Sequence, residues 1–177
     1  LVGASAGAWR FAAWLQPEAE KSYRALMEAY IEASYGRRDT PETILRSLQG
    51  IVDRYIDDDA LSFALACKPY RLAILTSRAK HLTASERLWV QKLGFILGFA
   101  ANALDPHLIH CFAERTVFYY GVQPPDFCLR KGFRGRCFPL SEVNFKAAVV
   151  ASGAIPIAVA GVRDIFEAPD GVYRDGG

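Results

Sequence analysis

Residues 1–15 read LVGASAGAWRFAAWL: two apolar residues that suit a strand, a run of small residues around one serine, and a segment that is apolar on nearly every side. A chain that passes from a strand into a helix within a few residues needs unusual backbone torsions and close packing, and both favour glycine and alanine. Residues 8–15 are expected to form a buried helix. The segment therefore predicts a strand, a sharp turn and a helix, with Ser5 at the turn.

The small residues match the pattern G-x-S-x-G, in which Gly3 and Gly7 enclose Ala4, Ser5 and Ala6. This pattern is typical of a nucleophile elbow, where a strand-to-helix turn presents a serine hydroxyl at the top of a sheet. The free N–H groups at the start of the helix, that of Ala6 among them, would stabilise a developing oxyanion. A helix entry rich in glycine and alanine, with an incidental serine, is the alternative interpretation.

Strand-like and helix-like segments alternate along the rest of the chain. Apolar residues at three- and four-residue steps predict helices over residues 18–34, 40–56, 83–104 and 140–151, with Thr40 and Ser141 as N-caps. β-prone runs predict strands over residues 71–76, 115–120, 126–130 and 171–174. This alternation favours an α/β fold, a layered sheet with helices on both faces, in a single domain over residues 1–177.

Composition excludes several classes of protein. The 21 Lys and Arg residues balance 19 Asp and Glu residues without a long basic run, so no nucleic-acid partner is expected. A content of 51% hydrophobic and 12% aromatic residues excludes a disordered chain. The longest uncharged run, residues 147–162, is broken by glycine and proline, so no membrane-spanning helix is expected. The first residues do not have the pattern of a signal peptide.

Neither the cysteines nor the acidic residues show the spacing of a metal site. The cysteines lack C-x-x-C spacing and nearby histidines, so four reduced and mostly buried thiols are expected: Cys67, Cys111, Cys128 and Cys137. The acidic triplet Asp57, Asp58 and Asp59 is interpreted as the cap of a short helix. Neither a metal nor a cofactor is therefore expected.

A serine is a poor nucleophile unless a base takes its proton. The histidines are His81, His107 and His110, and none follows them, so a late histidine is missing. Asp175 ends a predicted strand and precedes Gly176 and Gly177. An aspartate held against the Ser5 hydroxyl could accept its proton directly, although Asp-Gly-Gly alone is a turn signal. A hydrolase that uses Ser5, His110 and an aspartate from residues 57–59 is an alternative.

Taken together, Ser5 within Gly-Ala-Ser-Ala-Gly and Asp175 within Asp-Gly-Gly resemble the patatin-like phospholipase family. Residues 151–156, Ala-Ser-Gly-Ala-Ile-Pro, are also similar to the approach of that family to its aspartate. The resemblance covers both ends of the chain and not residues 37–120. It implies an α/β serine acyl hydrolase that needs no metal, with Ser5 as nucleophile, Asp175 as base, Gly3, Ala6 and Gly7 at the elbow, and Gly176 and Gly177 completing the motif.

The resemblance further implies that the substrate is a phospholipid or another acyl-ester lipid, met in the cytoplasm or at a membrane surface. The family places a glycine-rich oxyanion loop upstream of the elbow, and residues 1–177 are expected to lack this loop and its strand. A non-catalytic lipid-binding domain with the same fold is therefore a second alternative. Helices within residues 37–67 or 83–104 could form a lid. The apolar stretch 94–99 is expected in the core in preference to a lipid-facing flap.

Overall fold

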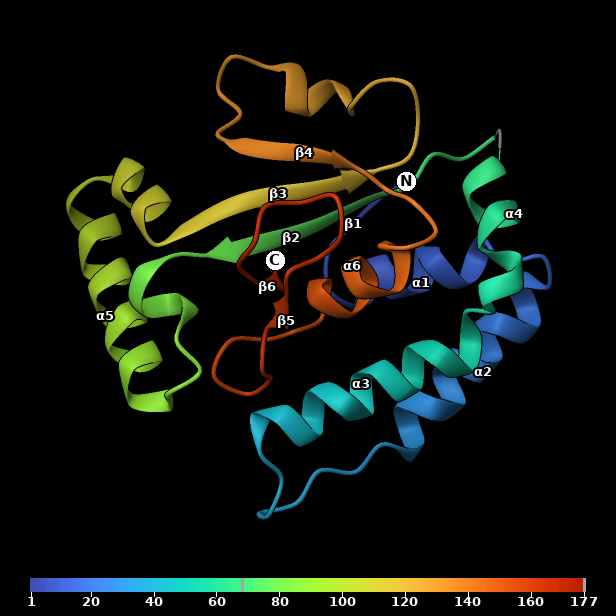
Figure 1. Cartoon of the computed structure of the whole chain (residues 1–177), viewed down its shortest axis with the longest axis horizontal. Coiled ribbons are helices and arrows are strands. Elements are labelled where there is room, and N and C mark those ends of the chain that lie inside the picture. Colours follow the sequence, from blue (N-terminus) through green and yellow to red (C-terminus); the bar gives the residue numbers. More distant parts are fainter. Residues whose placement is uncertain (68, 177) are drawn as a thin grey trace.

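The computed structural model describes residues 1–67 and 69–176. A six-stranded mixed sheet lies at its centre and is flanked by helices (Figure 1). The predicted α/β class is confirmed as a mixed sheet combined with helices. The strands are β1 (Val2–Gly3), β2 (Ala73–Ala79), β3 (Ala113–Tyr119), β4 (Gly135–Pro139), β5 (Val162–Arg163) and β6 (Val172–Asp175).

The strand order is β4-β3-β2-β6-β5, and β1 also pairs with β2. Two pairs are parallel, β1 with β2 and β3 with β4, whereas β2 with β3, β2 with β6 and β5 with β6 are antiparallel. The long strand β2 is therefore the central element, because it contacts three other strands.

The α-helices are α1 (Ala6–Trp14), α2 (Ala19–Glu32), α3 (Pro41–Tyr55), α4 (Leu61–Ala66), α5 (Leu88–Leu104) and α6 (Phe145–Ser152). Short 3₁₀ helices are η1 (Asp58–Ala60), η2 (His81–Ala84), η3 (Pro106–Cys111) and η4 (Asp126–Leu129). The predicted start of α3 is confirmed: Thr40 Oγ1 accepts a hydrogen bond from the Thr43 N–H at 3.3 Å, and Thr43 Oγ1 accepts one from the Thr40 N–H at 2.9 Å.

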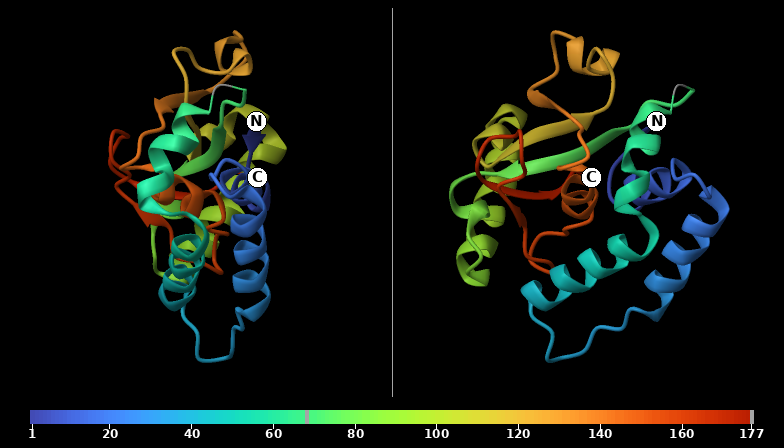
Figure 2. Two further views of the ribbon diagram at one scale, coloured as in Figure 1. Left: turned by 90° about the vertical axis from the view of Figure 1, so that its right-hand side faces the viewer. Right: turned by 45° about the vertical axis from the view of Figure 1, so that its right-hand side comes forward.

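The largest core cluster lies on one face of the sheet. Ile74 of β2 and Phe118 of β3 are paired in register, are fully buried and belong to this cluster together with Tyr173 of β6. Helices α1 and α6 contact β2 as well as each other, and α3 packs against α6 (Figure 2). The prediction of a buried first helix is confirmed by Ala8, Trp9, Ala12 and Ala13, each at most 4% exposed.

Two local predictions are wrong. Residues 126–130, predicted as a strand, contain the 3₁₀ helix η4, in which the Cys128 N–H donates to the Pro125 carbonyl at 2.8 Å and not to a neighbouring strand. Ser141 is not the N-cap of the helix predicted after it, because α6 starts only after Asn144. The Asn144 side chain instead accepts a hydrogen bond from the Ser141 N–H at 2.9 Å, which closes a turn before the helix.

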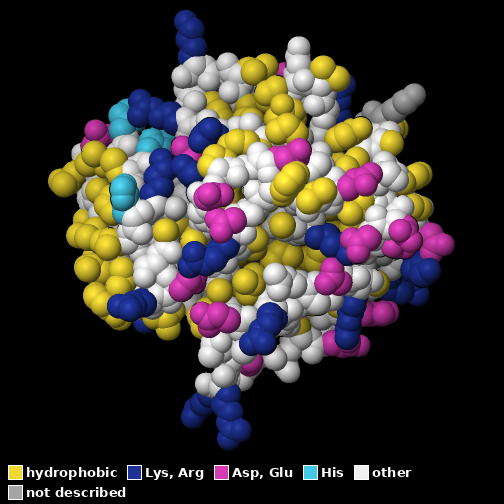
Figure 3. Space-filling view, in the orientation of Figure 1, with side chains coloured by type: hydrophobic (Ala, Val, Ile, Leu, Met, Phe, Trp, Pro, Cys, Tyr) yellow, Lys and Arg dark blue, Asp and Glu magenta, His cyan; other side chains and the backbone are white. Residues whose placement is uncertain are grey.

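The prediction that residues 94–99 lie in the core is also wrong. Helix α5 buries Gln91, Gly94 and Gly98 and exposes most of its large apolar side chains, which form the hydrophobic area over α5 in Figure 3. The reason is steric: a Cβ on Gly94 would lie 2.9 Å from the backbone of Leu82, so the glycine face makes the close contact. Hydropathy alone does not specify which face of an apolar helix meets its neighbour.

The cysteines are free thiols, as predicted, but the expectation that most are buried is wrong. Cys111 is exposed and the other three are partly exposed. Burial raises the pKa of the Cys137 thiol to about 12. Among the described residues, no helix has the length and apolar character needed to cross a bilayer.

Candidate active site

Ser5 lies at the turn between β1 and α1, as its motif predicts. Its backbone has φ 50° and ψ −134°, a conformation that side chains other than glycine rarely adopt. Helix α1 begins at once, because the Gly7 N–H donates to the Ala4 carbonyl at 2.9 Å and the Ala8 N–H to the Ser5 carbonyl at 3.0 Å. Such a torsion costs about 1–3 kcal/mol and persists only where surrounding structure holds it. The turn therefore has the strained geometry of a nucleophile elbow.

The two glycines of the motif differ in their surroundings. A Cβ on Gly3 would lie 2.7 Å from the Ala8 nitrogen, so close packing of strand on helix requires glycine there. A Cβ on Gly7 would meet no atom within 4 Å. Packing therefore explains Gly3 and leaves Gly7 without a steric requirement.

The sheet register brings the ends of β1 and β6 together. Strand β3 occupies one edge of β2 along all of Ala73–Ala79, so β1 and β6 share the other edge. Gly3 lies opposite Ile74, and Asp175 lies opposite Thr76. Strand β1 runs parallel to β2 and β6 runs antiparallel to it, so their carboxyl ends point toward each other. Two residues of a strand span about 6.6 Å, so Gly3 and Asp175 lie close together along this edge, and the Ser5 turn directly follows Gly3.

Gly176 occupies the register position between these two strand ends. A Cβ there would lie 2.6 Å from the carbonyl carbon of Leu75, so only glycine fits against β2. This close approach gives the first glycine of Asp-Gly-Gly a structural reason. Gly177, the second, lies outside the described residues.

Helices α1 and α6 support the same point of the molecule. The Trp9 indole N–H donates to the Val149 carbonyl at 2.8 Å, and a Cβ on Gly153 would lie 3.0 Å from that indole nitrogen. The backbone N–H of Asp175 donates to the Ala154 carbonyl at 3.0 Å. The Ala-Ser-Gly-Ala segment at the end of α6 therefore joins the helix that follows Ser5 to the strand that carries Asp175.

Arg174, the residue before Asp175, was not singled out from the sequence. It is 2% exposed; its guanidinium donates to the Val159 carbonyl at 2.9 Å and pairs with Glu86 at 3.1 Å. Burial lowers the pKa of Arg174, and the charge of Glu86 opposes that shift. The pair holds β6 against the segment before α5. A charged residue inside a short strand is the sequence signal that could have found it.

Ser5 and Asp175 are both partly exposed, and Ala6 is exposed. The Ser5 hydroxyl does not cap helix α1. A cavity of about 740 Å³ reaches Asp175 and Gly176, and Ser5 is not among its lining residues. Its wall includes Phe127, Phe133 and three arginines, Arg115, Arg130 and Arg134. Asp175 is therefore reached from a cavity whose walls suit a ligand with apolar and anionic parts.

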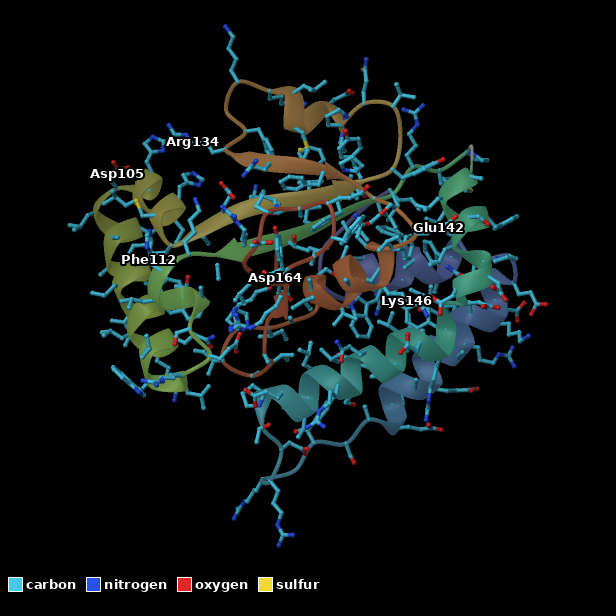
Figure 4. All side chains as sticks on the ribbon, viewed as in Figure 1. Asp105, Phe112, Arg134, Glu142, Lys146 and Asp164 are labelled. Carbon is cyan, nitrogen blue, oxygen red and sulfur yellow. The ribbon has the colours of Figure 1, made fainter. Side chains whose placement is uncertain are left out.

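The alternative site, with His110 and an aspartate from residues 57–59, is not brought together in the same way. His110 lines the cavity that contains Asp175. Asp57 Oδ1 accepts a hydrogen bond from the Asp59 N–H at 3.1 Å, which confirms the predicted helix cap. Asp58 pairs at 2.8 Å with Lys146 of α6 (Figure 4), and both line a different cavity with Asp57. The geometry favours Asp175 over the triplet as the partner of Ser5.

Within residues 1–67 and 69–176, no group of three His, Cys, Asp or Glu side chains gathers as a metal site would require. Comparisons with family models, with curated proteins and with solved structures give no match to this chain. The candidate site consists of a strained serine at the start of α1 and an aspartate at the end of an antiparallel strand, and both strands that lead to these residues pair with the same edge of β2.

Proposed function

We propose that this chain is a patatin-like serine acyl hydrolase that cleaves fatty acyl esters of phospholipids or related lipids, with Ser5 as nucleophile and Asp175 as base. The observation that supports this most is the meeting of β1 and β6 on one edge of β2, opposite Ile74 and Thr76. This register brings two distant motifs to one point, and each motif has the residue type that its role needs.

The chemistry requires only groups of this chain and water. Asp175 takes the proton of the Ser5 hydroxyl as Oγ attacks the ester carbonyl carbon, and the tetrahedral oxyanion lies at the start of α1, near the Ala6 N–H. The intermediate collapses, the Asp175 proton passes to the leaving alcohol, and an acyl group stays on Ser5.

Deacylation repeats the same sequence with water. Asp175 removes a proton from the water as its oxygen attacks the acyl carbon, and the proton then returns to Ser5 Oγ as the fatty acid leaves. The strained turn at Ser5 presents the hydroxyl in both steps, because a relaxed helical serine would lie along the helix and not at the strand end.

Turnover of a soluble short-chain ester by the full-length protein tests this proposal. Asp175→Asn removes the base and is expected to lower kcat by about 10³-fold with little change in KM, because general-base catalysis contributes only in the transition state. Asp59→Asn makes the same change in the acidic triplet and should leave kcat unchanged. Turnover that survives Asp175→Asn but disappears in His110→Asn would overturn the assignment of Asp175.

A further inference from the structure

Helix α5 and the following η3 carry a large exposed apolar face (Figure 3). Trp89 is 68% exposed, Phe99 72% and Leu104 85%. The other exposed members of this face are Leu88, Leu93, Ile96, Leu97 and Leu108. Lys92 is the one charged residue in the α5 segment. Apolar side chains gathered on one helix in this way mark an interaction surface.

The inward face of α5 fixes this orientation. The Gln91 side chain donates to the Ser85 carbonyl at 2.9 Å and accepts from the Ile157 N–H at 2.8 Å. Gly94 packs against the backbone of Leu82, and Gly98 packs against Phe112. A rotation that buried Trp89 and Phe99 would break these hydrogen bonds and put a side chain against Leu82, where only glycine fits. The outward apolar face is therefore built into the fold.

Cationic residues border this face. Helix η3, which holds His107 and His110, packs against α5, and Lys80 Nζ donates to the His110 carbonyl at 3.3 Å. Burial lowers the pKa of His110, and the positive charges of Arg134, Lys80 and Arg115 nearby lower it further. Figure 4 shows Arg134 on the same side of the molecule as Asp105 at the end of α5.

The acidic groups nearby cancel only part of this charge. Glu114 pairs with Arg78 at 2.9 Å and with Lys80 at 3.5 Å, and Asp105 caps η3 through the His107 N–H at 2.8 Å. No ion pair of Arg115 or Arg134 is found within the described part of the chain. The cationic border therefore keeps charge that a partner can neutralise.

We propose that the apolar face of α5 and η3, with Arg115 and Arg134 at its border, docks the protein on an anionic lipid bilayer. Aromatic and aliphatic side chains enter the boundary between headgroups and acyl chains, while Lys and Arg pair with anionic headgroups. The helix lies in the plane of the interface, with Gln91 and its glycines toward the protein. A protein partner of neutral or basic surface would leave the border charges unmatched.

Docking in this way deepens the proposed function, on which the following step rests. His110, Arg115 and Arg134 line the cavity that reaches Asp175 as well as bordering the apolar face. The docked bilayer would therefore meet the mouth of this cavity, which brings lipid to Asp175, the proposed base. Binding itself needs no chemistry at Ser5, so the two proposals can fail separately.

Binding of the full-length Ser5→Ala protein to vesicles tests the docking surface. Vesicles of phosphatidylcholine alone are compared with vesicles that also contain phosphatidylglycerol, and brominated lipids quench tryptophans that enter the interface. We expect stronger binding to the anionic vesicles and quenching of Trp89. Trp14, which is 53% exposed on α1, should stay unquenched. The variants Trp89→Phe and Trp14→Phe separate the fluorescence of these two tryptophans.

Paired variants locate the surface. The double variant Ile96→Asp with Phe99→Asp should weaken vesicle binding by about tenfold or more, since two apolar groups no longer enter the bilayer. Arg134→Ala should weaken binding to anionic vesicles by about fivefold and leave neutral vesicles unaffected. Ile31→Asp is the matched control, because Ile31 is 75% exposed on α2, outside the surface, and should bind normally.

Several results would overturn docking: equal binding to both vesicle types, equal loss in the α5 double variant and Ile31→Asp, or a Trp89 already shielded by a second copy or another part of the protein. Turnover of a soluble ester distinguishes a failure of the docking proposal from a failure of the proposed function. The α5 double variant with Ser5 intact should hydrolyse that ester normally, whereas a chain that binds vesicles but never hydrolyses it would contradict only the proposed function.

Discussion

Ser5 shows at the residue scale how a functional position departs from local preference. Its positive φ is a torsion for which glycine would be the favoured residue, yet a serine stands there. Ser5 is partly exposed, and its hydroxyl does not cap helix α1. Stability therefore does not explain why a serine occupies this strained position. Strained positions of this kind are typical of functional sites.

This strain can be measured. Replacing Ser5 by glycine removes both the hydroxyl and the strain, whereas alanine removes only the hydroxyl. We expect Ser5→Gly to unfold with a free energy about 1 kcal/mol above that of Ser5→Ala, because relief of the torsion exceeds the entropy that glycine adds to the unfolded chain. Urea denaturation of both variants gives the comparison.

Ser62 provides the matched control on α4. It is exposed in a helix, so the order should reverse there, with Ser62→Ala more stable than Ser62→Gly by about 1 kcal/mol. If Ser5→Ala were as stable as Ser5→Gly, the turn would hold no strain.

At the scale of elements, the sequence predicts features that depend on neighbouring residues, and it does not predict features that depend on distant contacts. The cap at Thr40 and the apolar stripe of α3 involve neighbours in the sequence, and both are confirmed. Helix α5 is different, since apolar residues surround its axis and the buried face is chosen by Gly94 and Gly98 meeting η2 and Phe112. Contacts between separate segments of the chain determine that orientation, and the spacing of apolar residues within α5 does not reveal such contacts.

The packing of β1 on α1 at the Ser5 turn also leads to a prediction at the scale of elements. Gly3→Ala should lower the free energy of unfolding by about 1–3 kcal/mol, since its Cβ would overlap the backbone at Ala8. Gly7→Ala should leave stability unchanged or raise it by up to about 1 kcal/mol, since the site is open and alanine favours the helix. Thermal unfolding distinguishes the two, and equal losses would mean that β1 and α1 do not pack as described.

At the scale of the whole molecule, the candidate site depends on the pairing of β1 and β6, strands from opposite ends of the sequence, with the same edge of β2. Motifs in the sequence identified Ser5 and Asp175, but register with β2 is a long-range property that no local pattern carries. Even β2 begins and ends later than its predicted range of residues 71–76. The Arg174–Glu86 pair, the Asp175 backbone bond to Ala154 and the fit of Gly176 against Leu75 complete the arrangement, and each joins distant segments.

The most direct test of the central claim, that Ser5 is activated by Asp175, is the position of a fluorophosphonate adduct on the full-length protein, found by mass spectrometry of its peptides. We expect one adduct on Ser5, no adduct there in Ser5→Ala, and labelling in Asp175→Asn that is slower by about 10³-fold because the hydroxyl loses its base. Labelling that is unchanged in Ser5→Ala, or equally fast in Asp175→Asn, would contradict the claim.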